Sequence, residues 1–195
     1  MYIFKLLISY FIFISFLLSK ENIQFSANIL ENIVEDDMEK RIFKDNVIVK
    51  KGTMLLYADE AIYIPSFREV ILKNNVKMID SEDSLLCNHL VLYDQANKEF
   101  SASGNVQFYK EKSLIKGNNL NYLESINGDT LNIDLYNDAQ VIDLQRKVFG
   151  DTLQINYLDS VIQNINVLSN AKCINSSYAR YKKENKLQPI EDRMS

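Results

Sequence analysis

The chain has 195 residues, with 22 Lys+Arg against 26 Asp+Glu and a formal net charge of −4, a length typical of one ordinary domain. Hydrophobic residues make up 47% and charged residues 25%, which argues against wholesale disorder, and the lack of a basic excess argues against a nucleic-acid partner. One His and two Cys are too few for a zinc ribbon or a disulfide scaffold. We therefore expect no metal site and no cofactor.

Residues 1–19 have the pattern of an export signal. Lys5 supplies a positive charge ahead of an apolar run at residues 6–18. A helix over that run is about 20 Å long, shorter than the roughly 30 Å hydrocarbon core of a bilayer. The alternative is an uncleaved anchor spanning with residues 1–19. Either reading exports the remainder, which we expect to be one β domain over residues 20–178 and a polar tail over residues 179–195.

An internal repeat organises the chain after residue 20. Four segments share a pattern around anchor valines separated by 29, 30 and 35 residues, namely Val47, Val76, Val106 and Val141. A weaker fifth copy places Cys173 at the anchor position. Two further columns keep step with the anchors: Val70, Phe100, Leu135 and Val167 lie six residues before, and Tyr63, Tyr93, Tyr122 and Tyr157 lie sixteen or seventeen residues after.

Within each repeat the hydrophobic period is two, which predicts β-strands. Leu153, Ile155 and Tyr157 alternate with polar neighbours, and polar turns such as Asn127-Gly128 separate the runs. Each unit therefore reads as two strands joined by short turns. The expected fold is all-β: an antiparallel, folded-over sheet of about ten strands, a jelly-roll-like groove. A parallel β-helix is the competing repeat fold.

The repeated elements resemble the OstA/LptA-type lipopolysaccharide-transport family. The resemblance rests on an export signal followed by "F-x-A-x-I" at residues 25–29, on repeated "N-V" elements such as Asn75-Val76, and on the stretch A-D-E-A-I-Y at residues 58–63. The familiar Gly two residues before the anchor valine is present only at Gly104. The resemblance covers roughly residues 23–175. It implies a periplasmic β-groove with an apolar interior, which carries or bridges lipopolysaccharide to the outer membrane without catalysis.

The inward columns are the candidate lipid-binding residues. They are expected to line one apolar trough, open along a seam, that holds the acyl chains of lipopolysaccharide; the alternative is an ordinary filled core. The set is Val47, Tyr63, Val70, Val76, Tyr93, Phe100, Val106, Tyr122, Leu135, Val141, Leu153 and Tyr157. Ile62, Ile64, Leu90 and Leu92 are expected on the opposite face from the tyrosines, which would make that face apolar too.

Other residues carry weaker signals. The first and last strands, residues 23–34 and 161–174, are nearly free of the Pro and Lys that protect sheet edges, so strand addition to other β-groove components or head-to-tail to a second copy is expected. Cys87 and Cys173 are expected to remain unpaired. Asp80 and its neighbours Glu82 and Asp83 are expected to be solvated turn charges. Five lysines near the expected mouth are candidates for lipid phosphates: Lys50, Lys51, Lys110, Lys112 and Lys116.

Three further functions remain open from the residues alone. A membrane-anchored LptC-like subunit would keep residues 1–19 as its span. An exported jelly-roll glycan hydrolase would need clustered carboxylates in an open polar cleft, although no catalytic motif is present. A purely structural repeat protein would have a closed core and take up no lipid.

Overall fold

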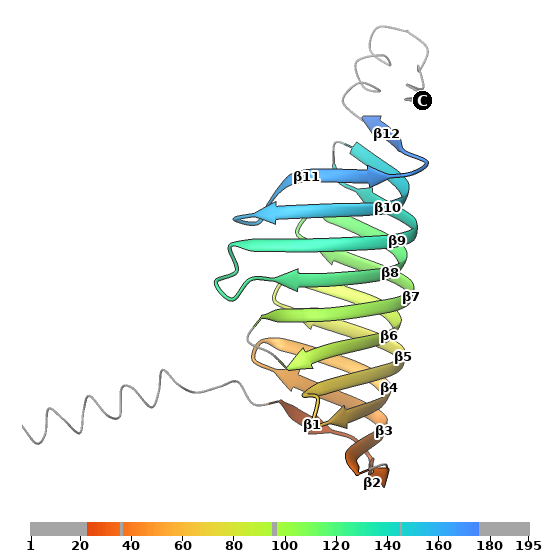
Figure 1. Cartoon of the computed structure of the whole chain (residues 1–195), viewed down its shortest axis with the longest axis vertical. Helices are drawn as coiled ribbons and strands as arrows, with labels where there is room; N and C mark the ends of the chain where they lie inside the picture. The colour runs from red at the N-terminus through yellow and green to blue at the C-terminus, as the bar shows by residue number, and fades with distance from the viewer. Residues whose placement is uncertain (1–22, 36, 95–96, 145, 176–195) are drawn as a thin grey trace, which may run out of the picture.

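The computed structural model describes residues 23–35, 37–94, 97–144 and 146–175. These residues form one antiparallel sheet of twelve strands, stacked as in Figure 1, which confirms the all-β prediction. The strands are β1 (Gln24–Ser26), β2 (Ile29–Glu35), β3 (Met38–Lys51), β4 (Met54–Ile64), β5 (Glu69–Asp80), β6 (Asp83–Asp94), β7 (Lys98–Lys110), β8 (Ser113–Glu124), β9 (Thr130–Ile142), β10 (Arg146–Leu158), β11 (Val161–Leu168) and β12 (Lys172–Asn175). The predicted signal and tail lie outside the described residues, among which no helix is long and apolar enough to span a membrane.

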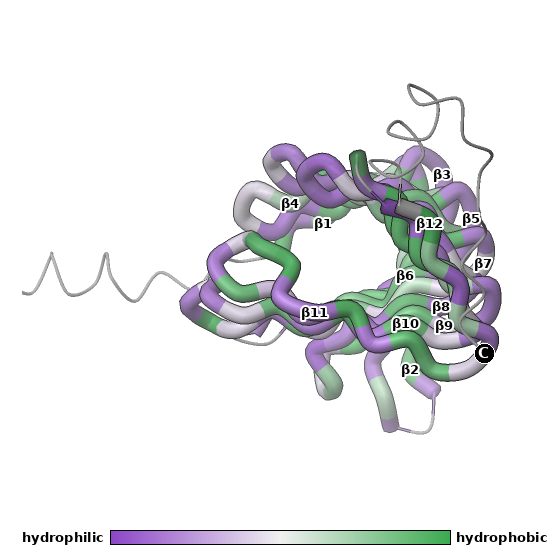
Figure 2. Tube along the Cα trace, turned by 90° about the horizontal axis from the view of Figure 1, so that it is seen from above, coloured by the Kyte–Doolittle hydropathy of each residue, from purple (hydrophilic) through white to green (hydrophobic). Residues whose placement is uncertain are grey.

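Each long strand bends once, near its middle. From β3 to β10, every ladder between neighbouring strands shifts register at this point, as a β-bulge does when it bends a strand. The bends lie along one corner and divide the sheet into two walls. Figure 2, which is seen from above, shows the chain passing from one wall to the other. We call wall A the part that carries the turns at residues 52–53, 81–82 and 111–112. Wall B is the part that carries the turns at residues 65–68 and 125–129.

Pairs of left-handed residues build the corner in alternate strands. In β5, Asn74 and Asn75 have φ of 62° and 51°, a conformation that Asn, Asp and Gly adopt more readily than other residues. The corresponding pairs are Asp45-Asn46, Gly104-Asn105, Asn137-Asp138 and Ser169-Asn170. The repeated asparagines of the sequence pattern are therefore the residues that turn the strand. In the fourth repeat, Asn137-Asp138 takes the place of Gly104-Asn105, so the residue that matches Val106 is Ala139 and Val141 lies two positions later.

The twelve strands correspond to ten bent strands, because the first and the last bent strand are each interrupted and therefore appear as two. At the N-terminal end, β1 pairs with the wall A part of β3 and β2 pairs with its wall B part. At the C-terminal end, β11 and β12 pair in the same way with the wall B and wall A parts of β10. Each of these end strands is broken at the corner, whereas the sequence pattern predicts a single strand there. The expected number therefore differs from the observed one only at the two ends.

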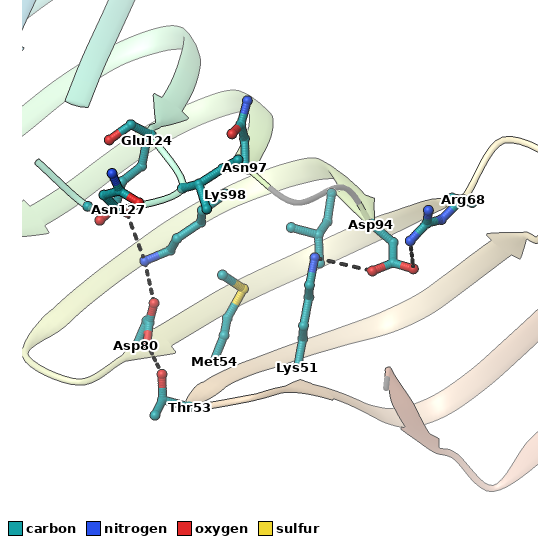
Figure 3. Close-up of a pocket in the computed structure, with 14 residues that line it drawn as sticks. Lys51, Thr53, Met54, Arg68, Asp80, Asp94, Asn97, Lys98, Glu124 and Asn127 are labelled. Atoms are coloured by element: carbon teal, nitrogen blue, oxygen red, sulfur yellow. Dashed lines mark hydrogen bonds and ion pairs between the residues drawn. The ribbon is translucent and has the colours of Figure 1, made fainter. Parts of the chain in front are cut away.

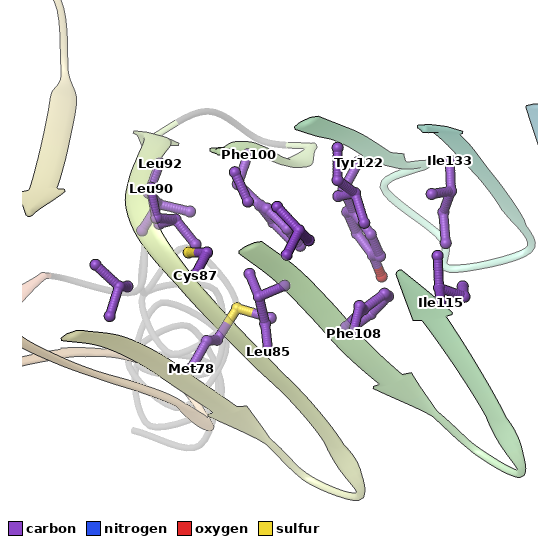
Figure 4. Packing of buried hydrophobic residues seen from close by; sticks show 14 of the residues in the cluster. Met78, Leu85, Cys87, Leu90, Leu92, Phe100, Phe108, Ile115, Tyr122 and Ile133 are labelled. Atoms are coloured by element: carbon purple, nitrogen blue, oxygen red, sulfur yellow. The ribbon is translucent and has the colours of Figure 1, made fainter. Parts of the chain in front are cut away.

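The two walls face each other and bury one apolar core between them. In Figure 4, Leu92, Phe100 and Tyr122 of wall B point toward Leu85 and Phe108 of wall A. All five are at most 1% exposed. The interior is thus filled by the chain's own side chains. The folded-over sheet is the predicted groove, and in the described residues aromatic and branched side chains of both walls fill its interior.

Candidate functional site: an apolar interior closed by a charged seam

Ten of the twelve predicted groove residues lie in the core. Each is at most 4% exposed, and together they extend from β3 to β10: Val47, Val70, Val76, Phe100, Val106, Tyr122, Leu135, Val141, Leu153 and Tyr157. Tyr63 is partly buried and packs against the core at its N-terminal end, where its ring lies 5.3 Å from that of Phe25. The repeat columns therefore identify one continuous inner surface.

Tyr93 lies on the other face of β6, and the expectation that it points inward is wrong. Its neighbour Leu92 is 1% exposed and pairs with Val70 and Phe100, so alternation along the strand turns Tyr93 outward. Tyr93 follows its anchor valine by seventeen residues, whereas the other tyrosines follow theirs by sixteen. A shift of one residue moves a side chain to the opposite face. For the same reason Leu90 and Leu92 belong to the core and not to the outer face.

Aromatic rings join the two walls in the middle and at the N-terminal end of the interior. Phe108 of wall A meets Phe100 and Tyr122 of wall B edge to face, with centroids 6.3 and 5.8 Å apart. Phe25 of β1 stacks on Phe43 of wall B at 4.5 Å. Such contacts add about 0.5–1.5 kcal/mol each to the gain from burial. The sequence columns do not include Phe108, although it lies two residues after Val106 and therefore on the same face of β7.

The inward columns end in charged residues where the walls meet opposite the corner. Along wall A, Val47 and Val49 are followed by Lys51, and Val76 and Met78 are followed by Asp80. The wall B strands end in the same way: Asp94, Lys98 and Glu124 each lie two residues from a buried apolar residue, namely Leu92, Phe100 and Tyr122. We call the line along which these ends meet the seam.

Ion pairs cross the seam from wall to wall (Figure 3). Lys51 Nζ lies 3.4 Å from Asp94 Oδ1, and its ammonium also donates to the carbonyl of Tyr93. Lys98 Nζ pairs with Asp80 Oδ2, while Asp80 Oδ1 accepts a hydrogen bond of 2.7 Å from Thr53. Asp80 is 9% exposed, so the expectation that it is a solvated turn charge is wrong. Its inward parity with Val76 and Met78 was the signal for this position.

The charges at the seam hold one another in their ionised forms. Burial opposes ionisation of Asp80, but hydrogen bonds from Lys98 and Thr53 outweigh it and lower the pKa of Asp80 below its ordinary value. Burial likewise opposes the charge of Lys98, and the carboxylates of Asp80 and Glu124 outweigh it and raise the pKa of Lys98. The pKa of Asp94 is lowered, against burial, by Arg68 and Lys51. These carboxylates are therefore poor general acids at neutral pH, since a glycosidase needs one whose pKa is raised.

A cavity of about 760 Å³ lies at this part of the seam. Lys51, Arg68 and Lys98 line it with their carboxylate partners, as Figure 3 shows. Met54 and Leu92 line it as well. These two side chains are 4% and 1% exposed and belong to the core. The cavity is thus lined by charged side chains and by side chains of the apolar interior.

The remaining candidate residues lie apart from this cavity. Lys110 of wall A lies over the ring of Tyr157 of wall B, 5.8 Å from its centroid, and pairs with Asp83 at 2.9 Å. Lys50 and Lys116 lie on strand positions next to inward residues and so face outward. Cys87 is buried in β6 and Cys173 is exposed in β12, each as a free thiol. Among the described residues no cluster of His, Cys, Asp and Glu is arranged to hold a metal ion.

Fold and site together define a folded-over antiparallel sheet with an apolar interior, a polar corner and an ionic seam. No protein-family model matches the chain, and no curated protein matches it in sequence. Among solved structures, the chain is similar to LptH from Pseudomonas aeruginosa, the LptA-homologous periplasmic component of the lipopolysaccharide transport device. The match has 13% identity and a TM-score of 0.29, and covers 90% of this chain and 93% of that one. Because a TM-score this low does not place two chains in one fold, the function proposed below rests on the residues of this chain.

Proposed function

We propose that the chain is an exported, non-catalytic carrier or bridge that holds the acyl chains of lipopolysaccharide between its two walls on the way to the outer membrane. This proposal rests on the uninterrupted apolar inner surface that extends from β3 to β10. At the seam, only side-chain contacts close this interior. The sequence resemblance to the OstA/LptA-type family supports it. Enclosing about ten methylenes of an acyl chain would contribute roughly 8 kcal/mol before ordering costs.

Photo-crosslinking tests where the lipid lies. A photoreactive amino acid at Phe100 or Tyr122 points into the interior, whereas one at Asn121 or Ser101 lies on the outer face of the same two strands. Incubation with lipopolysaccharide should give adducts from the two inner positions only. Adducts from the outer positions alone would contradict binding between the walls.

A structural repeat protein is the second candidate, because the interior is filled in the described structure. In that case the core would stay closed and take up no lipid. Absence of adducts from all four photoreactive positions, in variants whose circular dichroism and thermal unfolding match the wild-type protein, would favour this second candidate.

The two ends of the sheet are the proposed docking sites for other β-groove components or for a second copy. The N-terminal end exposes Leu30 and Val34 of β2, at 56% and 74%, and the C-terminal end exposes Val161 and Leu168. No described strand pairs with the outer edge of β2 or of β11, and unpaired edges invite strand addition. Leu30→Lys/Val34→Lys should remove concentration-dependent association in sedimentation velocity. Leu123→Lys, on a strand paired on both sides, is the matched control and should not.

The membrane-anchored alternative concerns residues 1–19, which lie outside the described residues. Mass spectrometry of the native N-terminus separates a cleaved periplasmic carrier from an LptC-like subunit that keeps its anchor. The lipid-binding proposal is the same for both.

A further inference from the structure

The outer face of wall A carries lysines but no carboxylate. Alternation along its strands turns one residue in two outward, from β1 to β12. Between the corner and the turns, none of the outward residues that the structure describes is Asp or Glu, and five are lysines: Lys50, Lys77, Lys116, Lys147 and Lys172. The exposed carboxylates beside this face lie at its borders, at the corner or in the turns: Asp45, Asp59, Asp138, Asp151, Glu82 and Glu111. The face is therefore basic, although the chain has a net charge of −4.

The five lysines differ from the outward lysines of wall B in having no partner. Within the described ranges, none of the five forms an ion pair. On wall B, the outward lysines of β3 and β5 each meet a carboxylate: Lys40 meets Glu35 at 2.6 Å, Lys44 meets Glu31 at 3.0 Å and Lys73 meets Glu60 at 2.9 Å. The chain thus balances the lysines of one outer face and leaves those of the other available to an external anion.

Apolar side chains lie among these lysines. Leu55 of β4 pairs with Ile79 of β5. Further along the sheet, Leu114 of β8 lies between Tyr109 of β7 and Ile142 of β9. Tyrosine is one of the two residue types enriched where a membrane meets water. The outer face of wall A is therefore both cationic and apolar, as are protein surfaces that lie on anionic membranes.

The spacing of the lysines matches an extended partner. Lys77, Lys116 and Lys172 share one row across the sheet, each three strands from the next. At roughly 4.8 Å per strand, their backbones are about 14 Å apart. A small anion is bound by cations that converge on it, whereas cations spread along such a row match a surface that presents many anionic groups. The apolar side chains among them favour a lipid surface over a nucleic acid.

We propose that the outer face of wall A docks on an anionic membrane surface, an inference that is independent of lipid uptake by the interior. The lysines meet the phosphates of anionic phospholipids, and Tyr109 and Leu86, which are 42% and 40% exposed, enter the head-group layer between them. The long axis of the folded sheet then lies along the membrane, and wall B faces away from it. Each lysine close to an anionic bilayer strengthens binding roughly fivefold, and salt screens this attraction.

Vesicle flotation tests this docking. The exported protein and all its variants keep the native N-terminus, so any contribution of residues 1–19 is the same throughout. The vesicles contain equal parts of phosphatidylcholine and phosphatidylglycerol, and vesicles of phosphatidylcholine alone are the neutral reference. Lys77→Gln/Lys116→Gln removes two cations from the outer face of wall A. Lys40→Gln/Lys73→Gln removes two from the outer face of wall B and is the matched control, because it changes the net charge equally.

We expect the wild-type protein to bind the anionic vesicles at least tenfold more tightly than the neutral ones. The wall A variant should lose at least tenfold in this affinity and the control variant less than twofold, with circular dichroism unchanged in both. Equal losses in the two variants would overturn the assignment to wall A, and equal binding of wild-type protein to both kinds of vesicle would overturn the recognition of anionic lipid. A wall A variant that binds vesicles normally but loses self-association in sedimentation velocity would assign the face to a second copy.

A fluorophore on β7 locates the membrane without changing any charge. Gln107→Cys and Ser101→Cys place an environment-sensitive label at outward positions of wall A and wall B on the same strand. A Cys173→Ser background leaves only the buried Cys87 as a native thiol. With anionic vesicles, the emission of the label at position 107 should shift to shorter wavelength, and that at position 101 should not change. Equal shifts, or a shift at position 101 alone, would overturn docking through wall A.

Discussion

The rings of Phe108 and Tyr122 meet edge to face, 5.8 Å between centroids, although they come from opposite walls of the folded sheet. Each is 1% exposed. Phe108 also packs edge to face on Phe100, which stacks on Tyr122 at 4.4 Å. This cluster of three rings joins the two walls in the middle of the apolar interior.

Phe108→Ala should therefore destabilise the protein by about 3–5 kcal/mol, the usual cost of removing a buried aromatic ring together with the cavity it leaves. Urea denaturation gives the free energy of unfolding. Tyr109→Ala, the next residue on the outer face and 42% exposed, is the control and should cost less than about 1 kcal/mol. Similar losses for the two variants would show that the walls do not pack at Phe108.

The corner predicts an unusual substitution pattern at Asn74. Its φ of 62° is unfavourable for β-branched residues, so Asn74→Val should lower the free energy of unfolding by about 1–2 kcal/mol. Asn74→Gly should be nearly neutral, because glycine adopts this conformation without steric cost. Thermal unfolding of both variants measures the difference. A valine variant as stable as the glycine variant would argue against a left-handed corner.

Two buried tyrosines should respond oppositely to loss of their hydroxyl groups. Tyr122 donates a hydrogen bond to Glu124, so Tyr122→Phe should destabilise by about 1.5–3 kcal/mol, as for hydrogen bonds to charged groups. The hydroxyl of Tyr157 is buried without a hydrogen-bond partner among the described residues. Tyr157→Phe removes that unsatisfied group and should leave stability unchanged or raise it. Unfolding in urea compares the two, and a larger loss for Tyr157→Phe would contradict this assignment.

Acid should weaken the seam. The pKa of Asp80 is lower in the folded state than in the unfolded state, where it is about 3.9. The ionised carboxylate therefore stabilises the fold above the unfolded pKa. This contribution is lost as the pH falls through the folded pKa. The difference in unfolding free energy between wild-type protein and Asp80→Asn should therefore be largest near neutral pH and shrink below about pH 4. Asp129→Asn, in an exposed turn, is the control and should change the free energy of unfolding by less than about 0.5 kcal/mol at neutral pH. If the difference in unfolding free energy between wild-type protein and Asp80→Asn did not change with pH, the ionised Asp80 would not stabilise the seam.

The periodicity of two and the repeat columns are sufficient to predict the all-β fold and ten of the twelve inner residues. They failed at Tyr93 because the column was aligned on residue type, and an offset of seventeen in place of sixteen reverses the face. Asp80 departs from the prediction because a charge next to a turn is usually solvated, whereas its parity with Val76 and Met78 points this side chain inward. The closing of the interior depends on how deeply the walls interdigitate, a tertiary property that strand patterns do not encode.

Native mass spectrometry tests the central claim most directly, by comparing lipopolysaccharide with its fully deacylated saccharide. If acyl chains lie between the walls, the folded protein should retain one lipopolysaccharide per chain and none of the deacylated form. Equal retention of both forms, or of neither, would contradict an interior that takes up lipid chains.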